Sequence, residues 1–109
     1  MKLPLQISFK NIARSKSVTN IVKEKAEKFD KLCPETISCR VTITMPHKHH
    51  HQGNFFKINI EVGLPGKKVA VSREAQNEIE NKDFYHALRE AFDAAYRQVE
   101  DYHKMRHAA

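Results

Sequence analysis

Apolar and polar residues alternate along three stretches of the chain, with a period of two residues. These stretches are residues 5–10, 37–45 and 56–62. A period of two predicts β-strands that bury one face and expose the other. A fourth, short strand is predicted around Val69 and Val71. It follows the tight-turn sequence Leu64-Pro65-Gly66, in which Pro presets the first central position and Gly accepts a positive φ.

Two further stretches carry apolar residues at helical spacing. The first follows Ser15 or Ser17, either of which can cap a helix, and it ends at Pro34. Its apolar side consists of Val18, Ile21, Val22, Ala26, Phe29 and Leu32. The second is predicted to begin at Asp83 as its N-cap. Its apolar stripe consists of Phe84, Tyr85, Leu88, Ala91, Phe92, Ala95, Val99 and Tyr102. The segment 73–82 before it lacks apolar periodicity, and a loop is predicted there.

The predicted order is β-α-β-β-β-α, within a single domain of residues 1–109. Each strand is apolar on one face only. We therefore expect an α+β fold of two layers, in which both helices pack on one face of a four-stranded mixed sheet. The helix between the first two strands allows them to be parallel neighbours, and the other strands pair as antiparallel hairpins. The open face is expected to carry Gln6, Ser8, Arg40, Thr42, Thr44, Lys57, Asn59 and Glu61.

The composition adds an electrostatic bias. Lys and Arg number 19 against 13 Asp and Glu, which gives a formal net charge of +6 and a pI near 9.4. This charge favours a polyanionic partner such as nucleic acid, although it is also of the size that keeps an ordinary small domain soluble. No apolar run approaches the roughly 20 residues that span a bilayer, and the N-terminus lacks the apolar block of a signal peptide. We expect a cytoplasmic protein with no membrane partner.

Basic residues recur along both predicted helices. In the first helix Lys25, Lys28 and Lys31 step by three, which forms a ridge that can follow a phosphate backbone. Glu24 and Glu27 each lie four residues before a lysine of this ridge, so a solvated helix face with ion pairs explains the pattern equally well. The candidate residues of the last helix are Arg89, Arg97, Lys104 and Arg106.

The last helix mixes these cations with other groups. Asp93, Glu100 and Asp101 interrupt the positive run, so the surface is less uniform than that of a dedicated nucleic-acid clamp. Tyr96 and Tyr102 lie next to the apolar stripe. They are expected in the core or at its rim, not as platforms that stack on bases.

The tract His47-Lys48-His49-His50-His51 offers imidazole nitrogens for Zn²⁺ or Ni²⁺, and His49 and His51 can share a face. No cysteine or carboxylate lies beside it to complete a tetrahedral site. We therefore expect adventitious metal binding at most, and neither a physiological metal nor another cofactor. A weakly basic loop that touches RNA is the preferred interpretation. Cys33 and Cys39 form neither a disulfide framework nor a metal pattern, and they are interpreted as small core residues.

Catalysis has little support in the sequence. The chain has no Gly-rich phosphate cradle and no nucleophile motif. Asp83 and His86 lie three residues apart, but a helix cap and a surface histidine explain both. We expect neither an enzyme nor a protein that binds a small-molecule substrate.

The whole chain resembles the family of ribosome hibernation promoting factors and ribosome-associated inhibitor A, also called sigma-54 modulation proteins. The resemblance rests on the element order, on the Leu64-Pro65-Gly66 turn and on two segments of the last helix. Asp83-Phe84-Tyr85-His86-Ala87-Leu88 is similar to the family's Asp-x-Tyr-x-Ala-Ile opening, and Arg97-Gln98-Val99 is similar to its later Arg-Gln-Leu. The turn His49-His50-His51-Gln52-Gly53 indicates a divergent branch.

This resemblance implies a short-form member that acts as a monomer and inhibits translation under stress or in stationary phase. Its partner would be the small ribosomal subunit, bound through rRNA near the decoding centre, in the channel that mRNA and tRNA use. Carried over by position, Lys25, Lys28 and Lys31 match basic sites on the family's first helix. Arg97 matches a basic site on the second helix.

Two departures from the family keep an alternative open. Ala94 stands where members usually carry Lys, and Asp101 lies near where another Lys is frequent. The residues available to compensate are Arg89, Lys104 and Arg106. The alternative is a protein-interaction or metal-responsive regulator that keeps the fold without binding ribosomes. An enzyme whose site has no recognisable motif is a weaker, third hypothesis.

Overall fold

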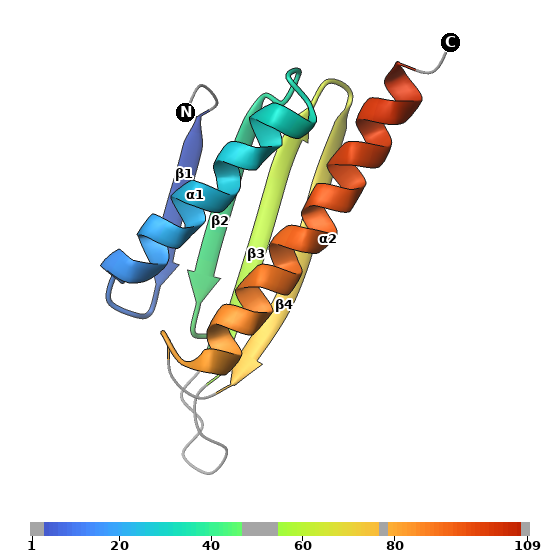
Figure 1. Cartoon of the computed structure of the whole chain (residues 1–109). Coiled ribbons are helices and arrows are strands. Elements are labelled where there is room, and N and C mark those ends of the chain that lie inside the picture. Colours follow the sequence, from blue (N-terminus) through green and yellow to red (C-terminus); the bar gives the residue numbers. More distant parts are fainter. Residues whose placement is uncertain (1–3, 47–54, 77–78, 108–109) are drawn as a thin grey trace.

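The computed structural model describes residues 4–46, 55–76 and 79–107. The elements follow one another in the predicted order, β-α-β-β-β-α (Figure 1). Their bounds are β1 Leu5–Lys10, α1 Lys16–Leu32, β2 Ser38–Thr44, β3 Phe55–Leu64, β4 Lys67–Gln76 and α2 Lys82–Arg106. The histidine tract, His47 to His51, lies outside the described residues.

The four strands form one sheet in the order β1-β2-β3-β4. β1 and β2 are parallel, with Leu5 opposite Cys39, and α1 makes the connection between them. The pairs β2–β3 and β3–β4 are antiparallel. The β3–β4 hairpin turns at Gly66, whose φ of 73° is the positive value that the turn sequence predicted. The mixed sheet predicted from the sequence is therefore confirmed.

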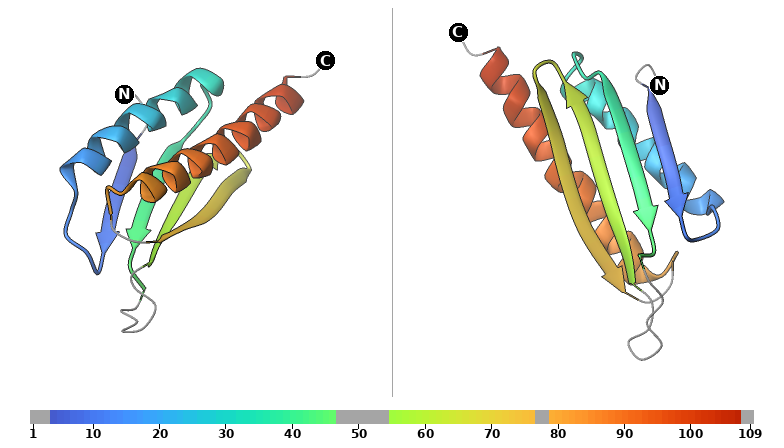
Figure 2. Two further views of the ribbon diagram at one scale, coloured as in Figure 1. Left: turned by 60° about the horizontal axis from the view of Figure 1, so that its bottom comes forward. Right: turned by 180° about the vertical axis from the view of Figure 1, so that it is seen from behind.

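Both helices cover the same face of the sheet, and the opposite face is open (Figures 1 and 2). In β3, every second residue from Phe56 to Leu64 is buried beneath the helices, and the residues between them are not. The largest fully buried side chains are Phe29, Phe84, Phe92, Ile43, Ile58, Ile60 and Leu88. They come from both helices and the inner strands, so the predicted two-layer α+β fold is confirmed. Neither described helix is long and apolar enough to cross a membrane.

The fourth strand is longer than predicted, and the loop predicted for residues 73–82 is wrong in its first part. β4 continues to Gln76 because it pairs with β3 along its whole length, where Ala75 lies opposite Phe56. Ala75 is buried, whereas Arg73 on the same side of the strand is exposed. β4 is an edge strand, and part of its inner face meets solvent. Polar residues are tolerated there, so the alternation that marks a strand is lost.

The helix ends are set by local hydrogen bonds. Ser15 caps α1, and its hydroxyl oxygen accepts the N–H of Val18 at 3.2 Å. The cap of α2 is Asn81, whose side-chain oxygen accepts the N–H of Asp83 at 2.9 Å. The prediction of Asp83 as the cap was therefore wrong by two residues. Asn and Asp are equally good caps, so the sequence alone did not distinguish them.

β2 begins one residue later than its pattern predicted. Ile37 was expected in the buried row of this strand, but it is 56% exposed. Its N–H donates to the carbonyl of Gly63 at 2.8 Å, so the backbone pairing extends beyond the core. At the other end the strand stops at Thr44, and Met45 is half-buried just outside it.

Candidate nucleic-acid interface

The two helices lie side by side on the sheet (Figure 1). Where they meet, the side chains of Phe29, Phe92 and Tyr96 form an aromatic seam. The ring of Phe29 lies 6.1 Å from that of Phe92 and 5.1 Å from that of Tyr96, measured between centroids. Phe29 and Phe92 are fully buried, and Tyr96 is half-buried. Aromatic contacts at such separations stabilise packing beyond the apolar area they bury. The seam therefore fixes how the two helices lie relative to each other.

Tyr96 also contacts two lysines of α1. Its hydroxyl donates to the backbone carbonyl of Lys25 at 2.7 Å. Burial raises the pKa of Tyr96, so the hydroxyl remains protonated and keeps donating. The ammonium of Lys28 lies 4.6 Å from the centre of the Tyr96 ring, which is a cation–π distance. The expectation that Tyr96 lies at the rim of the core is confirmed by these contacts.

Lys25, Lys28 and Lys31 form what we call the lysine ridge. Lys28 and Lys31 are exposed, and Lys25 is half-buried beside the seam. Among the described residues, no acidic side chain forms an ion pair with any of the three lysines. The helix ion pairs that offered the alternative explanation are therefore not formed. Ammonium groups without carboxylate partners have no ion pair to break when they bind phosphates and release counterions.

The basic residues predicted on α2 differ in their surroundings. Arg97 follows Tyr96 in the chain and is exposed, and Lys104 is exposed near the end of the helix. Neither of them forms an ion pair in the part of the chain that the structure describes. Arg89 lies near the beginning of the helix, with its guanidinium 3.3 Å from the Nδ1 of His86. Lys104 comes 15 residues after Arg89, about 22 Å along a helix, so these residues follow α2 instead of forming one cluster.

Arg106 has an acidic partner. Its Nε lies 3.6 Å from the carboxylate of Glu35, and its Nη1 donates to the hydroxyl of Tyr102 at 3.1 Å. The Nε2 of His107 lies 2.7 Å from the same carboxylate. This hydrogen bond is the largest reason why the pKa of Glu35 lies below its ordinary value. Phosphate binding by Arg106 stays a prediction, and it would require this ion pair to open.

The open face of the sheet differs from the helical face (Figure 2, right). Glu61 lies in its middle and pairs with Arg40 at 4.0 Å and with Lys68 at 3.6 Å. Phe55 is the only aromatic residue at the described positions of this face. Sheet-based RNA readers stack two or three bases on aromatic side chains. The described part of the open face lacks such a set of aromatic platforms, and Glu61 partly neutralises its cations.

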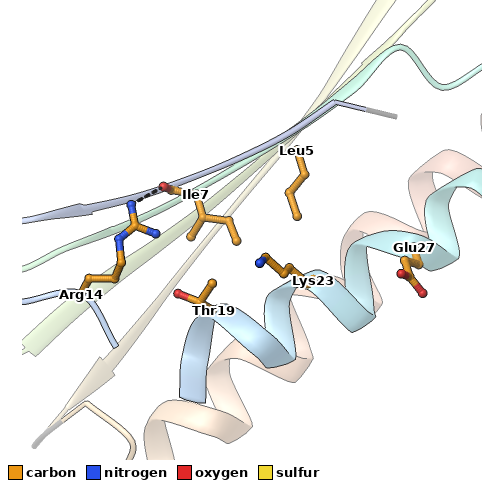
Figure 3. A pocket seen from close by; sticks show the side chains of 6 residues that line it. All are labelled: Leu5, Ile7, Arg14, Thr19, Lys23 and Glu27. Carbon is orange, nitrogen blue, oxygen red and sulfur yellow. Dashed lines mark hydrogen bonds between the residues drawn. The ribbon is translucent and has the colours of Figure 1, made fainter. Parts of the chain in front are cut away.

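A hollow of about 470 Å³ opens between α1 and β1, on the side of α1 that faces away from α2 (Figure 3). Its lining consists of Leu5, Ile7, Arg14, Thr19, Lys23 and Glu27. Arg14 is engaged with the carbonyl of Ile7 at 3.4 Å, and the hydroxyl of Thr19 donates to the carbonyl of Ser15 at 2.8 Å. Glu27 lies about two helical turns beyond Thr19. The carboxylate of this lining therefore lies far along α1 from the Thr19 hydroxyl, which is already hydrogen-bonded to the backbone.

Replacing Tyr96 by Phe removes the hydroxyl that ties α2 to the backbone of Lys25 while the ring remains. We expect the free energy of unfolding to fall by about 0.5–1.5 kcal/mol, as for a typical hydrogen bond, in urea denaturation. Tyr85→Phe is the matched control, because no described residue forms a hydrogen bond with the hydroxyl of Tyr85. Equal stability of the two variants would contradict the assignment.

Residues 5–107 match the family model described as "Sigma 54 modulation protein / S30EA ribosomal protein". The chain belongs to this family. The match covers both helices and all four strands, and it confirms the resemblance found in the sequence. The family is one of ribosome-associated factors.

Two solved structures are similar to this member of the family. The N-terminal domain of Protein Y from Thermus thermophilus has 20% sequence identity and a TM-score of 0.68, over 92% of this chain and 99% of that one. A ribosomal subunit interface protein from Coxiella burnetii has 12% identity and a TM-score of 0.68, over 92% and 97% of the two chains. At these identities the likeness establishes the fold. No curated protein sequence matches the chain significantly.

The sequence did not single out Tyr96 as an anchor or Glu35 as a partner of basic residues. Each contacts a residue that is distant in the sequence: Tyr96 and Lys25 are 71 residues apart, and Glu35 and His107 are 72 residues apart. Helical periodicity placed Tyr96 at the edge of the apolar stripe, which was the available signal. A local pattern contains no information about which residue of a distant helix such a side chain will meet.

Proposed function

We propose that this protein is a ribosome hibernation factor that binds rRNA of the small subunit and silences translation by occupying the channel of mRNA and tRNA. The observation that carries the proposal is the lysine ridge, which has no carboxylate partner among the described residues and two of whose lysines, Lys25 and Lys28, contact Tyr96. The formal net charge of +6 and the membership of a ribosome-associated family support it.

The protein acts by occupying the channel, and no covalent bond is made or broken. The lysine ridge and Arg97 contact phosphates of the rRNA, and Arg89 and Lys104 extend the surface along α2. Each contact releases condensed counterions, which supplies most of the affinity without reading the base sequence. The aromatic seam holds both helices in one arrangement, so the cations are presented at a fixed spacing. A fixed spacing of cations suits a folded RNA, which proteins recognise mainly by shape.

The proposal also places the protein in the cytoplasm, as a monomer, under stress or in stationary phase. The name of the Coxiella burnetii relative, a ribosomal subunit interface protein, supports a binding place where the two subunits face each other. A protein in that place would compete directly with mRNA and tRNA. Ala94 is packed against the core and Asp101 is exposed, so the second helix contributes fewer cations than family members usually carry.

Sedimentation through a sucrose gradient with separated ribosomal subunits tests this function. We expect the chain to migrate with the small subunit at low salt and to remain at the top of the gradient with the large subunit alone. The same protein should inhibit translation in a cell-free system at the concentration that saturates the small subunit. A chain that stays at the top with both subunits at low salt would favour a regulator that binds another protein.

Changing Arg40 and Lys57 to Ala tests whether the open sheet face takes no part in RNA binding. We expect binding to the small subunit to remain within about twofold of the wild type, because Arg40 is already paired with Glu61 and this face lacks aromatic platforms. The measurement is the affinity of the variant and of the wild type for the small subunit, by filter binding at one fixed salt concentration. A loss of tenfold or more would move the RNA-binding surface to the sheet.

A further inference from the structure

Cys33, Glu35 and His103 come together where the end of α1 meets the last turns of α2. Cys33 is the C-cap residue of α1, and its N–H donates to the carbonyl of Phe29 at 2.9 Å. The hydroxyl of Thr36 donates to the carbonyl of Cys33 at 2.7 Å, which holds the turn that carries Glu35. His103 reaches the same point from α2. The tertiary fold thus brings together three side chains of types that commonly bind metal ions.

The separations of the three groups fit a tetrahedral metal. The Sγ of Cys33 lies 3.5 Å from the Oε1 of Glu35, and the Nδ1 of His103 lies 3.5 Å from the same oxygen. All three atoms lie within 4.8 Å of one another. Bonds of about 2.0–2.3 Å in tetrahedral geometry place the ligands of Zn²⁺ roughly 3.3–3.8 Å apart. Two of the three separations already have this value.

The Nδ1 of His103 gives an independent indication. It is buried, and it has no hydrogen-bond partner among the described residues. Its contact of 3.5 Å with the Oε1 of Glu35 is not a hydrogen bond, and a buried polar atom that makes no hydrogen bond is costly and rare in folded proteins. A metal ion between this nitrogen, the thiolate and the carboxylate would satisfy it.

The other carboxylate oxygen of Glu35 contacts two basic side chains. Its Oε2 lies 2.7 Å from the Nε2 of His107 and 3.6 Å from the Nε of Arg106. This arrangement leaves Oε1 directed toward Cys33 and His103. Outer groups that orient a ligating carboxylate in this way are typical of metal centres.

We propose that Cys33, Glu35 and His103 form a binding site for a zinc-class divalent cation, with a water molecule as the fourth ligand. Thiolate and imidazole favour Zn²⁺ or Co²⁺ over Mg²⁺ or Ca²⁺. On binding, the thiol of Cys33 loses its proton to solvent, because the thiolate is the ligand. The site clamps the end of α1 to the end of α2, so the cation stabilises the helical layer. The inference does not depend on ribosome binding.

The test is a titration with Co²⁺, followed by the absorption band that a thiolate-to-cobalt bond gives in the near ultraviolet. All proteins carry His47, His49, His50 and His51 replaced by Asn, so that the histidine tract contributes no metal binding. We expect one Co²⁺ per chain, a thiolate band, and its displacement by Zn²⁺. At a hundredfold excess of Zn²⁺ over the dissociation constant, the melting temperature should rise by roughly 10 °C.

The variants separate this site from other thiols and imidazoles. Cys33→Ser should abolish the band, and His103→Gln should weaken Co²⁺ binding by more than about tenfold. Cys39→Ala and His86→Gln are the controls, because neither residue lies in the cluster, and both should keep the band. Circular dichroism of each variant checks that it is folded. A saturated protein without a thiolate band, a band that persists in folded Cys33→Ser, or an unchanged melting temperature in Zn²⁺ would overturn the proposal.

Discussion

Replacing Lys25, Lys28 and Arg97 together by Glu is expected to weaken binding to the small ribosomal subunit by more than about a hundredfold. A hydrogen bond that involves a charged group contributes about 1.5–3 kcal/mol, so each lost phosphate contact costs roughly tenfold or more in affinity. The reversed charges add repulsion to that loss. The side chains of Lys28 and Arg97 are exposed, and Tyr96 bonds to the backbone of Lys25, so the variant should remain folded.

A matched variant on the open sheet face controls for net charge. Lys10, Arg40 and Lys57 all lie on that face, and their replacement by Glu also takes the formal net charge from +6 to zero. Long-range attraction to RNA depends on the overall charge and changes similarly in both variants. We expect the sheet variant to bind far more tightly than the helix variant. Equal losses would mean that the helices carry no specific binding surface.

Phe29→Ala is expected to lower the free energy of unfolding by about 3–5 kcal/mol. Phe29 is fully buried and contacts both Phe92 and Tyr96, so its removal opens a cavity where the two helices meet. Total stabilities of about 5–15 kcal/mol are usual, so this loss is a large share of the stability. Urea denaturation monitored by circular dichroism measures the change.

Met105→Ala is the control for this effect. Met105 is 80% exposed and lies on α2 beyond the core, so its truncation should change the stability by at most about 0.5 kcal/mol. A loss below about 1 kcal/mol in Phe29→Ala would show that the seam does not hold the helices together.

The fold followed from residues whose burial has a regular period. The alternation in β1, β2 and β3 and the helical spacing in α1 and α2 reflect geometries that repeat along the chain. The turn at Gly66 has a local sequence signature of its own. The prediction failed for the second half of β4, where an edge position lets Arg73 and its neighbours stay exposed. It also failed at the start of α2, where Asn81 and Asp83 are equally competent caps.

The candidate site was predictable only in part. The step of three among Lys25, Lys28 and Lys31 identified a ridge, but their ion-pairing state depends on rotamers that spacing does not determine. Among the described residues, the lysine ridge has no carboxylate partner, whereas Arg106 forms an ion pair with Glu35. That ion pair and the nearby Cys33–His103 cluster join residues about 70 positions apart. Such contacts arise from the packing of α1 on α2 and have no local signature.

The most direct test of rRNA binding through the helical face is the affinity of the unmodified chain for isolated small subunits at several salt concentrations. Four phosphate contacts, by the lysine ridge and Arg97, predict a dissociation constant that rises with a log–log slope of about 3 to 4. Lys28→Glu should reduce the slope by about one. A dissociation constant that does not change with salt, or no binding at the lowest salt concentration, would contradict the account.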